Sequence, residues 1–337
     1  MIIVLDPTQH NAVGTMRGEG RFVALLKEHL SKETANFVGD LKSIPFGSTL
    51  LIPTWDPLAP PILTKRSCKR QILVIFDVIP LKYPQHFPVG LRGKLNLWRN
   101  KRALSEIDTI ITISNTAKSD IMDILGVAEH KIEVLPLTVF AQATSTPLTL
   151  PFSGDFLLYV GDVNWNKNLP NLANALLKTR TSTVFAGKPF ENECRERTLH
   201  GPIHPWEQDY KEFLQLLQGQ DFIHFAGYVS NEELLWLYEN ALGNMLVSRD
   251  EGFGLSYLEA ASHGCPSVLS DIPVFREIAG DTGALFADPD RPEDIAHAIR
   301  ELSDSSIRKN VIQEAQKRAA LYSPEAFALR LEEIVSK

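Results

Sequence analysis

The sequence predicts an α/β protein made of two doubly wound domains, each with a parallel sheet covered by helices on both faces. Short runs rich in β-branched residues alternate with helical stretches along the whole chain, which is typical of parallel sheets. At 337 residues the chain is long for a single core. Residues 138–154, rich in Thr, Ser and Pro, separate two such alternating halves and are typical of a linker.

The first half, residues 1–146, contains six expected strands and at least three helices. The strands are mostly short runs of Val, Ile and Leu, as expected for strands buried on both faces. They fall near residues 2–5, 35–38, 49–52, 72–76, 109–113 and 132–135. The helices fall near residues 20–31, 91–104 and 116–125.

The second half, residues 147–322, repeats the same alternation. Its strands are expected near residues 156–160, 183–186, 222–224, 244–248, 266–269 and 284–286, with helices between them. Residues 323–337 form a third segment, a helix over about 324–336. It begins at Ser323-Pro324-Glu325, a capping residue followed by proline at the first helical position.

Composition narrows the class of protein. Apolar residues make up 44% and charged residues 22%, a globular composition. No apolar run approaches the roughly 20 residues of a membrane span, and no signal peptide is visible at the start. Cys68, Cys194 and Cys265 are widely spaced and suggest neither a disulfide framework nor a zinc site. We therefore expect a cytoplasmic protein.

Charge is distributed unevenly between the halves. Residues 1–146 hold 17 Lys and Arg against 13 Asp and Glu, a net charge of +4, and the remainder holds 17 against 28, or −11. The densest basic cluster lies in 91–104, where Leu and Trp residues are interleaved with Arg and Lys. This pattern predicts either a helix lying on anionic lipid, at the inner face of the membrane, or a solvated helix whose apolar side is in the core. Nucleic acid is not an expected partner, since the total charge is acidic and no recognised motif occurs.

The most informative stretch is Glu251-Gly-Phe-Gly-Leu-Ser-Tyr-Leu-Glu259. A strand near 244–248 leads into two glycines that permit a tight turn, and a helix is expected from Leu255 to His263. Free amides at a helix start suit a phosphate, whereas carboxylates accept hydrogen bonds from hydroxyl groups. Glu259 lies one turn along the helix and leans towards its start. The stretch therefore offers a phosphate site with a hydroxyl acceptor on each side of it. A nucleotide sugar has the matching order of sugar, phosphate and sugar. The alternative is a plain strand-to-helix turn with a solvated Glu259.

Further motifs extend this pattern along the chain. They are Gly18-Glu-Gly-Arg-Phe22, Asp77-Val-Ile-Pro-Leu-Lys-Tyr-Pro84, Thr112-Ile-Ser-Asn-Thr-Ala-Lys118, Tyr159-Val-Gly-Asp-Val-Asn-Trp-Asn-Lys-Asn168 and the run from Phe225 to Asp288 around the two glutamates. In this order they resemble the GT4 family of retaining glycosyltransferases over nearly the whole chain. The resemblance implies a GT-B fold, with two Rossmann-like domains whose sheets face across a cleft and a last helix that packs back on the N-terminal domain.

The resemblance also implies roles for individual residues. Glu251 would hold a hydroxyl of the transferred sugar, Glu259 the ribose hydroxyls, and Lys167 the departing diphosphate. The other donor-binding positions implied are Gly18, Gly20, Gly161, Gly187, Lys188, Val229, Phe253, Gly254 and Leu255. Where the family usually has Arg-Lys, this chain has Asn166-Lys167. Lys167 and backbone amides would then act alone unless Arg249 or Lys188 assists; Lys167 as an ordinary surface lysine is the alternative.

The acceptor side is marked by Asp77, which follows a buried strand at its carboxyl end. Many relatives have His-Asp at this step, but here it is Phe76-Asp77. Asp77 is expected either to orient the acceptor hydroxyl or balance charge on the sugar, or only to cap the following turn. The histidines show no metal-ligand spacing, and Asp288-Pro-Asp290 is interpreted as the approach to a helix. No metal cofactor is expected.

We therefore expect a retaining hexosyltransferase that uses GDP-mannose or a UDP-sugar. Its acceptor would be a glycan or a lipid-linked molecule, and the Asp77–Pro84 segment resembles bacterial polysaccharide mannosyltransferases. Two alternatives remain open at this point: a catalytically weak scaffold that binds a nucleotide sugar, and a sugar-nucleotide epimerase on the same fold. A dinucleotide dehydrogenase is disfavoured, because no Gly-x-Gly-x-x-Gly follows the first strand.

Overall fold

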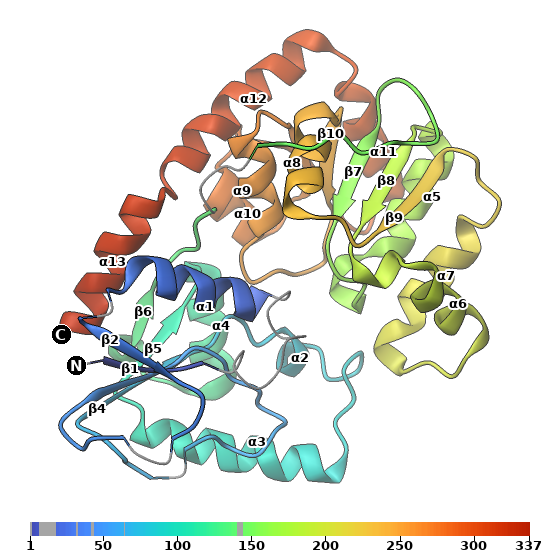
Figure 1. The fold of residues 1–337 in the computed structure, drawn as a ribbon. Helices are drawn as coiled ribbons and strands as arrows, with labels where there is room; N and C mark the ends of the chain where they lie inside the picture. The colour runs from blue at the N-terminus through green and yellow to red at the C-terminus, as the bar shows by residue number, and fades with distance from the viewer. Residues whose placement is uncertain (1, 7–17, 32, 42–43, 64, 140–143) are drawn as a thin grey trace. The chain divides into compact units, whose positions relative to one another are not determined.

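A computed structural model describes residues 2–6, 18–31, 33–41, 44–63, 65–139 and 144–337 (Figure 1). The chain divides into two compact units. The first unit comprises Met1–Phe140 together with Pro324–Lys337, and the second unit comprises Ala141–Ser323. Among the described helices, none has the length and hydropathy needed to cross a membrane.

The first unit is built on a six-stranded sheet in which every pairing is parallel. In sheet order the strands are β2 (Ala35–Val38), β1 (Ile2–Leu5), β3 (Thr49–Ile52), β4 (Arg70–Val74), β5 (Thr109–Thr112) and β6 (Ile132–Val134). The helices are α1 (Gly18–His29), α2 (Ile79–Lys82), α3 (Leu91–Ala103), α4 (Asn115–Leu125) and α13 (Pro324–Ser336). In Figure 1, α1 lies above this sheet and α3 below it, so helices cover both faces.

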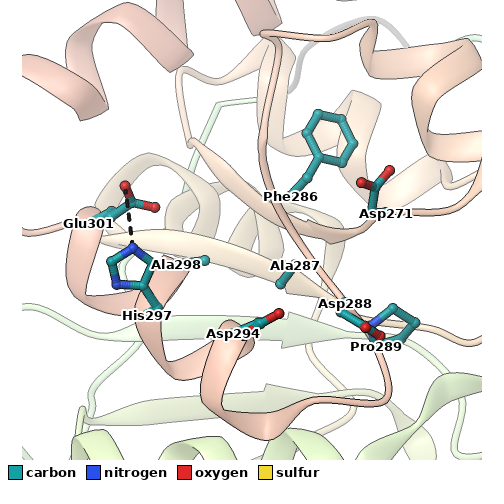
Figure 2. Close-up of a pocket in the computed structure, with 9 residues that line it drawn as sticks. All are labelled: Asp271, Phe286, Ala287, Asp288, Pro289, Asp294, His297, Ala298 and Glu301. Atoms are coloured by element: carbon teal, nitrogen blue, oxygen red, sulfur yellow. Dashed lines mark ion pairs between the residues drawn. The ribbon is translucent and has the colours of Figure 1, made fainter.

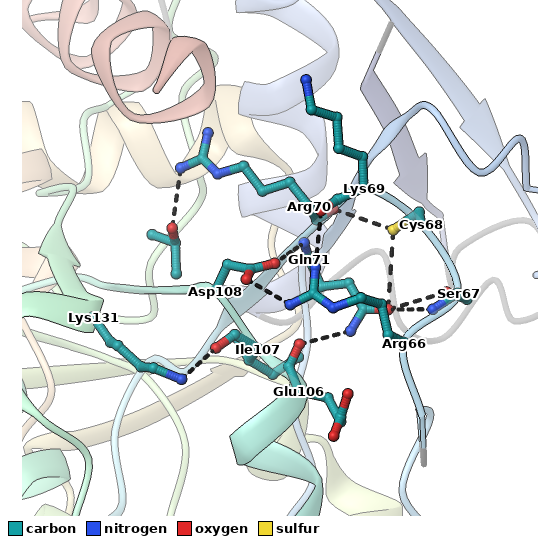
Figure 3. A network of polar contacts seen from close by, with 11 residues as sticks. Arg66, Ser67, Cys68, Lys69, Arg70, Gln71, Glu106, Ile107, Asp108 and Lys131 are labelled. Carbon is teal, nitrogen blue, oxygen red and sulfur yellow. Dashed lines mark hydrogen bonds and ion pairs between the residues drawn. The ribbon is translucent and has the colours of Figure 1, made fainter.

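Strand β4 begins at Arg70, two residues before the predicted start, because polar side chains extend its pairing (Figure 3). The carboxylate of Asp108 accepts hydrogen bonds from the backbone N–H of Gln71, at 2.8 Å, and from Arg66, at 2.6 Å. Burial alone would raise the pKa of Asp108, but these two bonds and the positive charges of Arg66 and Lys131 together outweigh it, and the pKa is lowered. The Asp108 carboxylate therefore holds the start of β4, where the sequence has no apolar residue to indicate a strand.

Helix α13 is held against the first unit by Arg70 and Arg330. Arg70 donates to the carbonyl oxygens of Ile334, at 2.8 Å, and Val335, at 3.2 Å, which lie in the last turn of α13. Arg330 donates to the Glu133 carboxylate at 2.7 Å. These bonds, made across nearly 200 or more residues of sequence, place the end of the chain on the edge of the first sheet.

The second unit has a second all-parallel sheet. In sheet order its strands are β12 (Leu285–Ala287), β11 (Ser267–Ser270), β10 (Gly243–Leu246), β7 (Leu157–Val160), β8 (Thr183–Ala186) and β9 (Ile223–Gly227). Chain order runs outwards in both directions from β7 and β10. This reversal is the topological switch point at which doubly wound domains bind their ligands, at the carboxyl ends of the strands. The two parallel sheets confirm the predicted fold class.

Alternating side chains of β7 and β8 build a core on each face of the second sheet. Leu157, Tyr159 and Phe185 pack with α5 (Leu169–Thr179), α7 (Gln208–Leu216) and α11 (Pro292–Glu301). Leu158 and Val184 pack with α8 (Asn231–Asn240) and α9 (Leu255–Ser262). The remaining helices of the second unit are α6 (Asn192–His200), α10 (Pro273–Ala279) and α12 (Ser305–Ala320).

Helix α3 departs from one of the two interpretations offered by its sequence. Three of its four leucine and tryptophan side chains are exposed, Leu91 by 88%, Leu95 by 47% and Trp98 by 56%, and Leu97 is half-buried. The side chains that α3 buries are those of Asn96 and Asn100. A solvated helix with its apolar side inside is therefore wrong for this segment.

Candidate active site

Two loops meet beside the topological switch point of the second unit. The β7 loop, residues 161–168, follows β7, and the β10 loop, residues 247–254, follows β10. The backbone N–H of Arg249 donates to the carbonyl of Asn166 at 2.7 Å, which joins the two loops directly. Both are therefore held at the carboxyl edge of the sheet, where a ligand is expected.

The central pair of the site is Lys167 and Glu251. Lys167 ends a short 3-10 turn, Trp165–Lys167, directly before α5, which begins at Leu169 as predicted. Its Nζ lies 2.5 Å from Oε1 of Glu251, and Ser248 Oγ lies 2.8 Å from the same oxygen. The two charged side chains are only 18% and 11% exposed. A cation and a hydrogen-bond acceptor are thus held side by side, partly withdrawn from water, where electrostatic effects are strengthened.

Two buried asparagines of the β7 loop hold the β10 loop in place. Asn166, 6% exposed, donates through Nδ2 to the carbonyl of Asp250 at 3.0 Å. Asn168 is fully buried and donates to the carbonyl of Val247 at 3.0 Å. At the position where the family usually has arginine, this chain therefore has a side chain that braces the loop carrying Glu251.

Arg249 braces the same loops from the other side. Its Nη1 donates to the carbonyl oxygen of Trp165 at 2.5 Å and to the Asp209 carboxylate at 2.7 Å. Its guanidinium also stacks over the Trp165 ring, 4.9 Å from the centroid. These contacts favour a positioning role for Arg249 over the phosphate contact considered from the sequence. Lys188 is exposed at the start of the turn Lys188–Phe190.

Helix α9 presents its amino end to the same loops. It begins at Leu255, and no side chain caps it among the described residues around Gly254. Gly254 has φ 104°, and a Cβ there would come within 2.8 Å of the Phe275 ring. Only glycine fits this position, and it allows the chain to turn sharply directly before the first amides of α9. Phe253 is buried, 5.7 Å from the Tyr322 ring, so it contributes its backbone rather than its side chain.

Glu259 lies one turn into α9 and has a partner that the sequence did not indicate. The hydroxyl of Tyr238 donates to Glu259 Oε2 at 3.0 Å. Tyr238 lies in α8 and is 2% exposed. No periodicity links positions 21 apart on different helices, so only the tertiary structure reveals this contact.

The predicted glycines Gly161 and Gly187 lie next to each other, directly after β7 and β8. Gly187 has φ 141°, and a Cβ on it would lie 2.7 Å from the Gly161 carbonyl oxygen. Its N–H donates to the carbonyl of Gly227 at 2.7 Å, which ties β8 to β9. Val229, just beyond β9, is partly buried against the second-unit core. A side chain at Gly187 would therefore collide with the backbone of Gly161.

The first unit carries the predicted residues Asp77, Gly18 and Gly20. Asp77 accepts a hydrogen bond from the N–H of Ile79 at 3.0 Å, the capping contact expected as one alternative. Phe76 packs edge-on against Phe22, with ring centroids 5.3 Å apart, and so serves the core where many relatives have histidine. Gly18 and Gly20 lie in the first turn of α1 rather than in a loop. The preceding residues 7–17 lie outside the described part of the chain.

A hollow in the second unit, shown in Figure 2, lies beyond the carboxyl ends of β11 and β12. Its polar lining is Asp271, Asp288, Asp294, His297 and Glu301. This acidic lining would repel an anionic ligand such as a diphosphate. Across the described residues, no group of three His, Cys, Asp or Glu side chains is placed to hold a metal ion.

Comparison with known proteins gives a family match and several similar relatives. Residues 146–318, just over half the chain, match the family model described as glycosyl transferases group 1. The chain is 28% identical to the O-antigen chain mannosyltransferase B of Escherichia coli over 72% of its length and 63% of that protein's. It is 27% identical to the O-antigen chain mannosyltransferase RfbU of Salmonella typhimurium, over 77% of its own length and 66% of that protein's. The chain thus spans about two thirds of these relatives or less.

The fold has solved counterparts as well. The Anabaena protein HepE, in its complex with UDP-glucose, superposes with a TM-score of 0.72 over 99% of each chain at 13% identity. At that identity the likeness concerns the fold, which is of the GT-B type. With a family model covering more than half of its residues, the chain belongs to the glycosyl transferases group 1 family, the GT4-type proteins that its motifs resemble.

Proposed function

We propose that the chain is a retaining glycosyltransferase that moves a hexose from a nucleoside diphosphate sugar to a hydroxyl of a glycan or lipid-linked acceptor. The observation that carries the proposal is the Lys167–Glu251 pair, 2.5 Å apart beside the amino end of α9. A diphosphate resting on that helix end would face Lys167, with the hexose towards Glu251 and the ribose towards Glu259. In this arrangement a lysine and helix amides would balance the phosphate charge, and two carboxylates would accept hydrogen bonds from the sugar hydroxyls.

In the proposed reaction, the bond between the anomeric carbon and the diphosphate oxygen breaks as the acceptor oxygen bonds to the same face of that carbon. The departing phosphate oxygen takes the acceptor's proton. Lys167 and the α9 amides stabilise the negative charge on the leaving diphosphate, and Glu251 positions the hexose. The protein contributes positioning and electrostatic stabilisation, without a covalent sugar intermediate and without a metal.

Mannose is the proposed hexose, in the synthesis of a bacterial surface polysaccharide. The two O-antigen mannosyltransferases similar to this chain support it. A UDP-sugar is the second candidate donor, because the structurally similar HepE forms a complex with UDP-glucose. Cys68, Cys194 and Cys265 are free thiols, in keeping with a reducing compartment, and we propose a cytoplasmic reaction.

A donor screen followed by a transfer assay tests the proposal. Thermal unfolding would be followed with GDP, UDP, GDP-mannose and UDP-glucose, and each donor that raises the melting temperature would then be assayed for release of its sugar. We expect one base to stabilise the protein and its sugar to be released, slowly to water and faster to a glycan acceptor. Stabilisation without any sugar release would favour a scaffold instead. Conversion of the donor sugar without an acceptor would identify an epimerase.

A further inference from the structure

The basic helix α3 has the side-chain arrangement of a helix that lies in a membrane surface. At about 100° per residue, Leu91, Leu95 and Trp98 fall on one side of the helix. Arg92 and Arg99 fall along one edge of this apolar strip, and Lys94 and Lys101 along the other. All seven side chains are exposed. An apolar strip with a row of cations on each side is the pattern of a helix that sits between acyl chains and headgroups.

The opposite side of α3 fixes this orientation. Asn96 donates through Nδ2 to the carbonyl of Leu58 at 2.8 Å. Asn100 donates to the carbonyls of Pro57, at 3.1 Å, and Ala59, at 2.8 Å. A buried amide that lost these partners would be destabilising, so the asparagine side must face inwards. The helix therefore presents its leucines and tryptophan to solvent because its polar side is committed to the protein.

We propose that α3 docks on an anionic lipid bilayer, with Leu91, Leu95 and Trp98 among the acyl chains. Charge decides the partner: Leu91–Ala103 contains five Arg and Lys residues and no acidic residue, in a chain whose net charge is −7. Tryptophan is favoured at the boundary between headgroups and acyl chains. Arg102 falls on the same side as the apolar strip, and its guanidinium lies 5.2 Å from the Trp98 ring; its long side chain would extend from there to the headgroups. The proposal does not rest on the transfer reaction.

Vesicle flotation tests the docking directly. The full chain is expected to float with vesicles containing about 30% phosphatidylglycerol and to remain unbound with pure phosphatidylcholine. Binding should weaken as salt rises, because screening shortens the reach of the charges. Each basic side chain near such a surface contributes about fivefold to partitioning. The triple variant Arg92→Glu, Lys94→Glu, Arg99→Glu should therefore lose at least about 10²-fold.

Matched controls separate α3 from the rest of the chain. Lys65→Glu, Lys69→Glu, Lys309→Glu makes the same change in net charge at exposed sites outside α3 and should bind within about fivefold of the wild type. Leu91→Ser, Leu95→Ser, Trp98→Ser should abolish flotation, whereas Leu321→Ser, Leu329→Ser, at residues that are 61% and 65% exposed, should not. Brominated lipid should quench the wild-type fluorescence but have much less effect on Trp98→Phe, which should still bind.

Three results would overturn the proposal. One is no flotation of the wild type with anionic vesicles. Another is equal binding by the charge-reversed α3 variant and its control. The third is a lipid-free dimer that dissociates on substitution of Leu91, Leu95 and Trp98, since a second copy of the chain would then cover this side.

Discussion

Helices α3 and α5 both cover a parallel sheet, and they bury opposite kinds of side chain. Helix α5 buries Leu169, Leu172 and Leu176 in the second-unit core. Helix α3 buries Asn96 and Asn100 and exposes Leu91, Leu95 and Trp98. The comparison shows that an apolar stripe identifies one side of a helix but not whether that side faces the core. The hydrogen-bond partners available to the opposite side of the helix decide which side faces the protein.

The largest effect is expected at the start of α5. Lys167→Ala should lower kcat by about 10²–10³-fold, because one electrostatic contact to the developing charge is lost. Glu251→Gln should reduce kcat less, because an amide still fills the space but no longer pairs with Lys167. Lys178→Ala, at the other end of α5, is the matched control and should leave kcat within about twofold. Steady-state kinetics checks all three variants. Near-normal turnover of Lys167→Ala would show that the active site is assigned wrongly.

One substitution in each helix tests whether α3 and α5 differ in the burial of their leucines. Leu172→Ala in α5 should cost about 2–5 kcal/mol of unfolding free energy, because it opens a cavity in a closed core. Leu95→Ala in α3 should change it by at most about 0.5 kcal/mol, because the side chain is 47% exposed. Urea unfolding measures both values. A cost above about 2 kcal/mol for Leu95→Ala would place that leucine in a core.

The buried side of α3 should be sensitive where its exposed side is not. Asn100→Ala removes the donor to the carbonyls of Pro57 and Ala59 and should cost about 1–3 kcal/mol. Asn240→Ala, which removes an exposed bond to the carbonyl of Trp236, should cost less than about 0.5 kcal/mol. If denaturant unfolding gave the two variants the same stability, the asparagines of α3 would not be its anchor.

The smallest effect is expected from pH, through His224 and His263 of the second unit. Burial lowers the pKa of both, with Arg195 adding to the effect at His224 and Glu239 and Glu259 opposing it at His263. Because the folded form resists protonation, their contribution to stability is complete above about pH 6.5 and is lost as the pH falls through the lowered values. His224→Asn, His263→Asn should therefore show a smaller fall in melting temperature between pH 7.5 and 5.5 than the wild type. An equal fall in both proteins would contradict this.

Much of the fold could be predicted from the sequence because local signals and tertiary structure agree. Strands β1, β2, β3 and β8 and helix α13 have the predicted bounds, and α5 starts after Lys167 as expected. The start of β4 was missed because Arg70 donates to Thr109 and the backbone N–H of Gln71 donates to Asp108, and β propensity does not register such partners.

Within the candidate site, residue types were easier to predict than the contacts between them. The spacing of Glu251 and Glu259 indicated a turn and a helix face, and the structure has both. The partners of Asn166, Arg249 and Tyr238 lie 21 to 84 residues away and follow from how strands are ordered in the sheet. The capping bond of Asp77 was foreseen as an alternative, whereas its role towards an acceptor stays a prediction.

The division of the chain into units has a practical consequence for gene design. The second unit, Ala141–Ser323, is encoded as one uninterrupted stretch, whereas the first unit is encoded in two pieces. A gene ending before Pro324 would strip Phe327, Leu331 and Ile334 from the first core and leave Arg70 without the carbonyl oxygens of α13. A chimaera that exchanges the first unit between homologues should therefore carry the last fourteen codons along with the front of the gene.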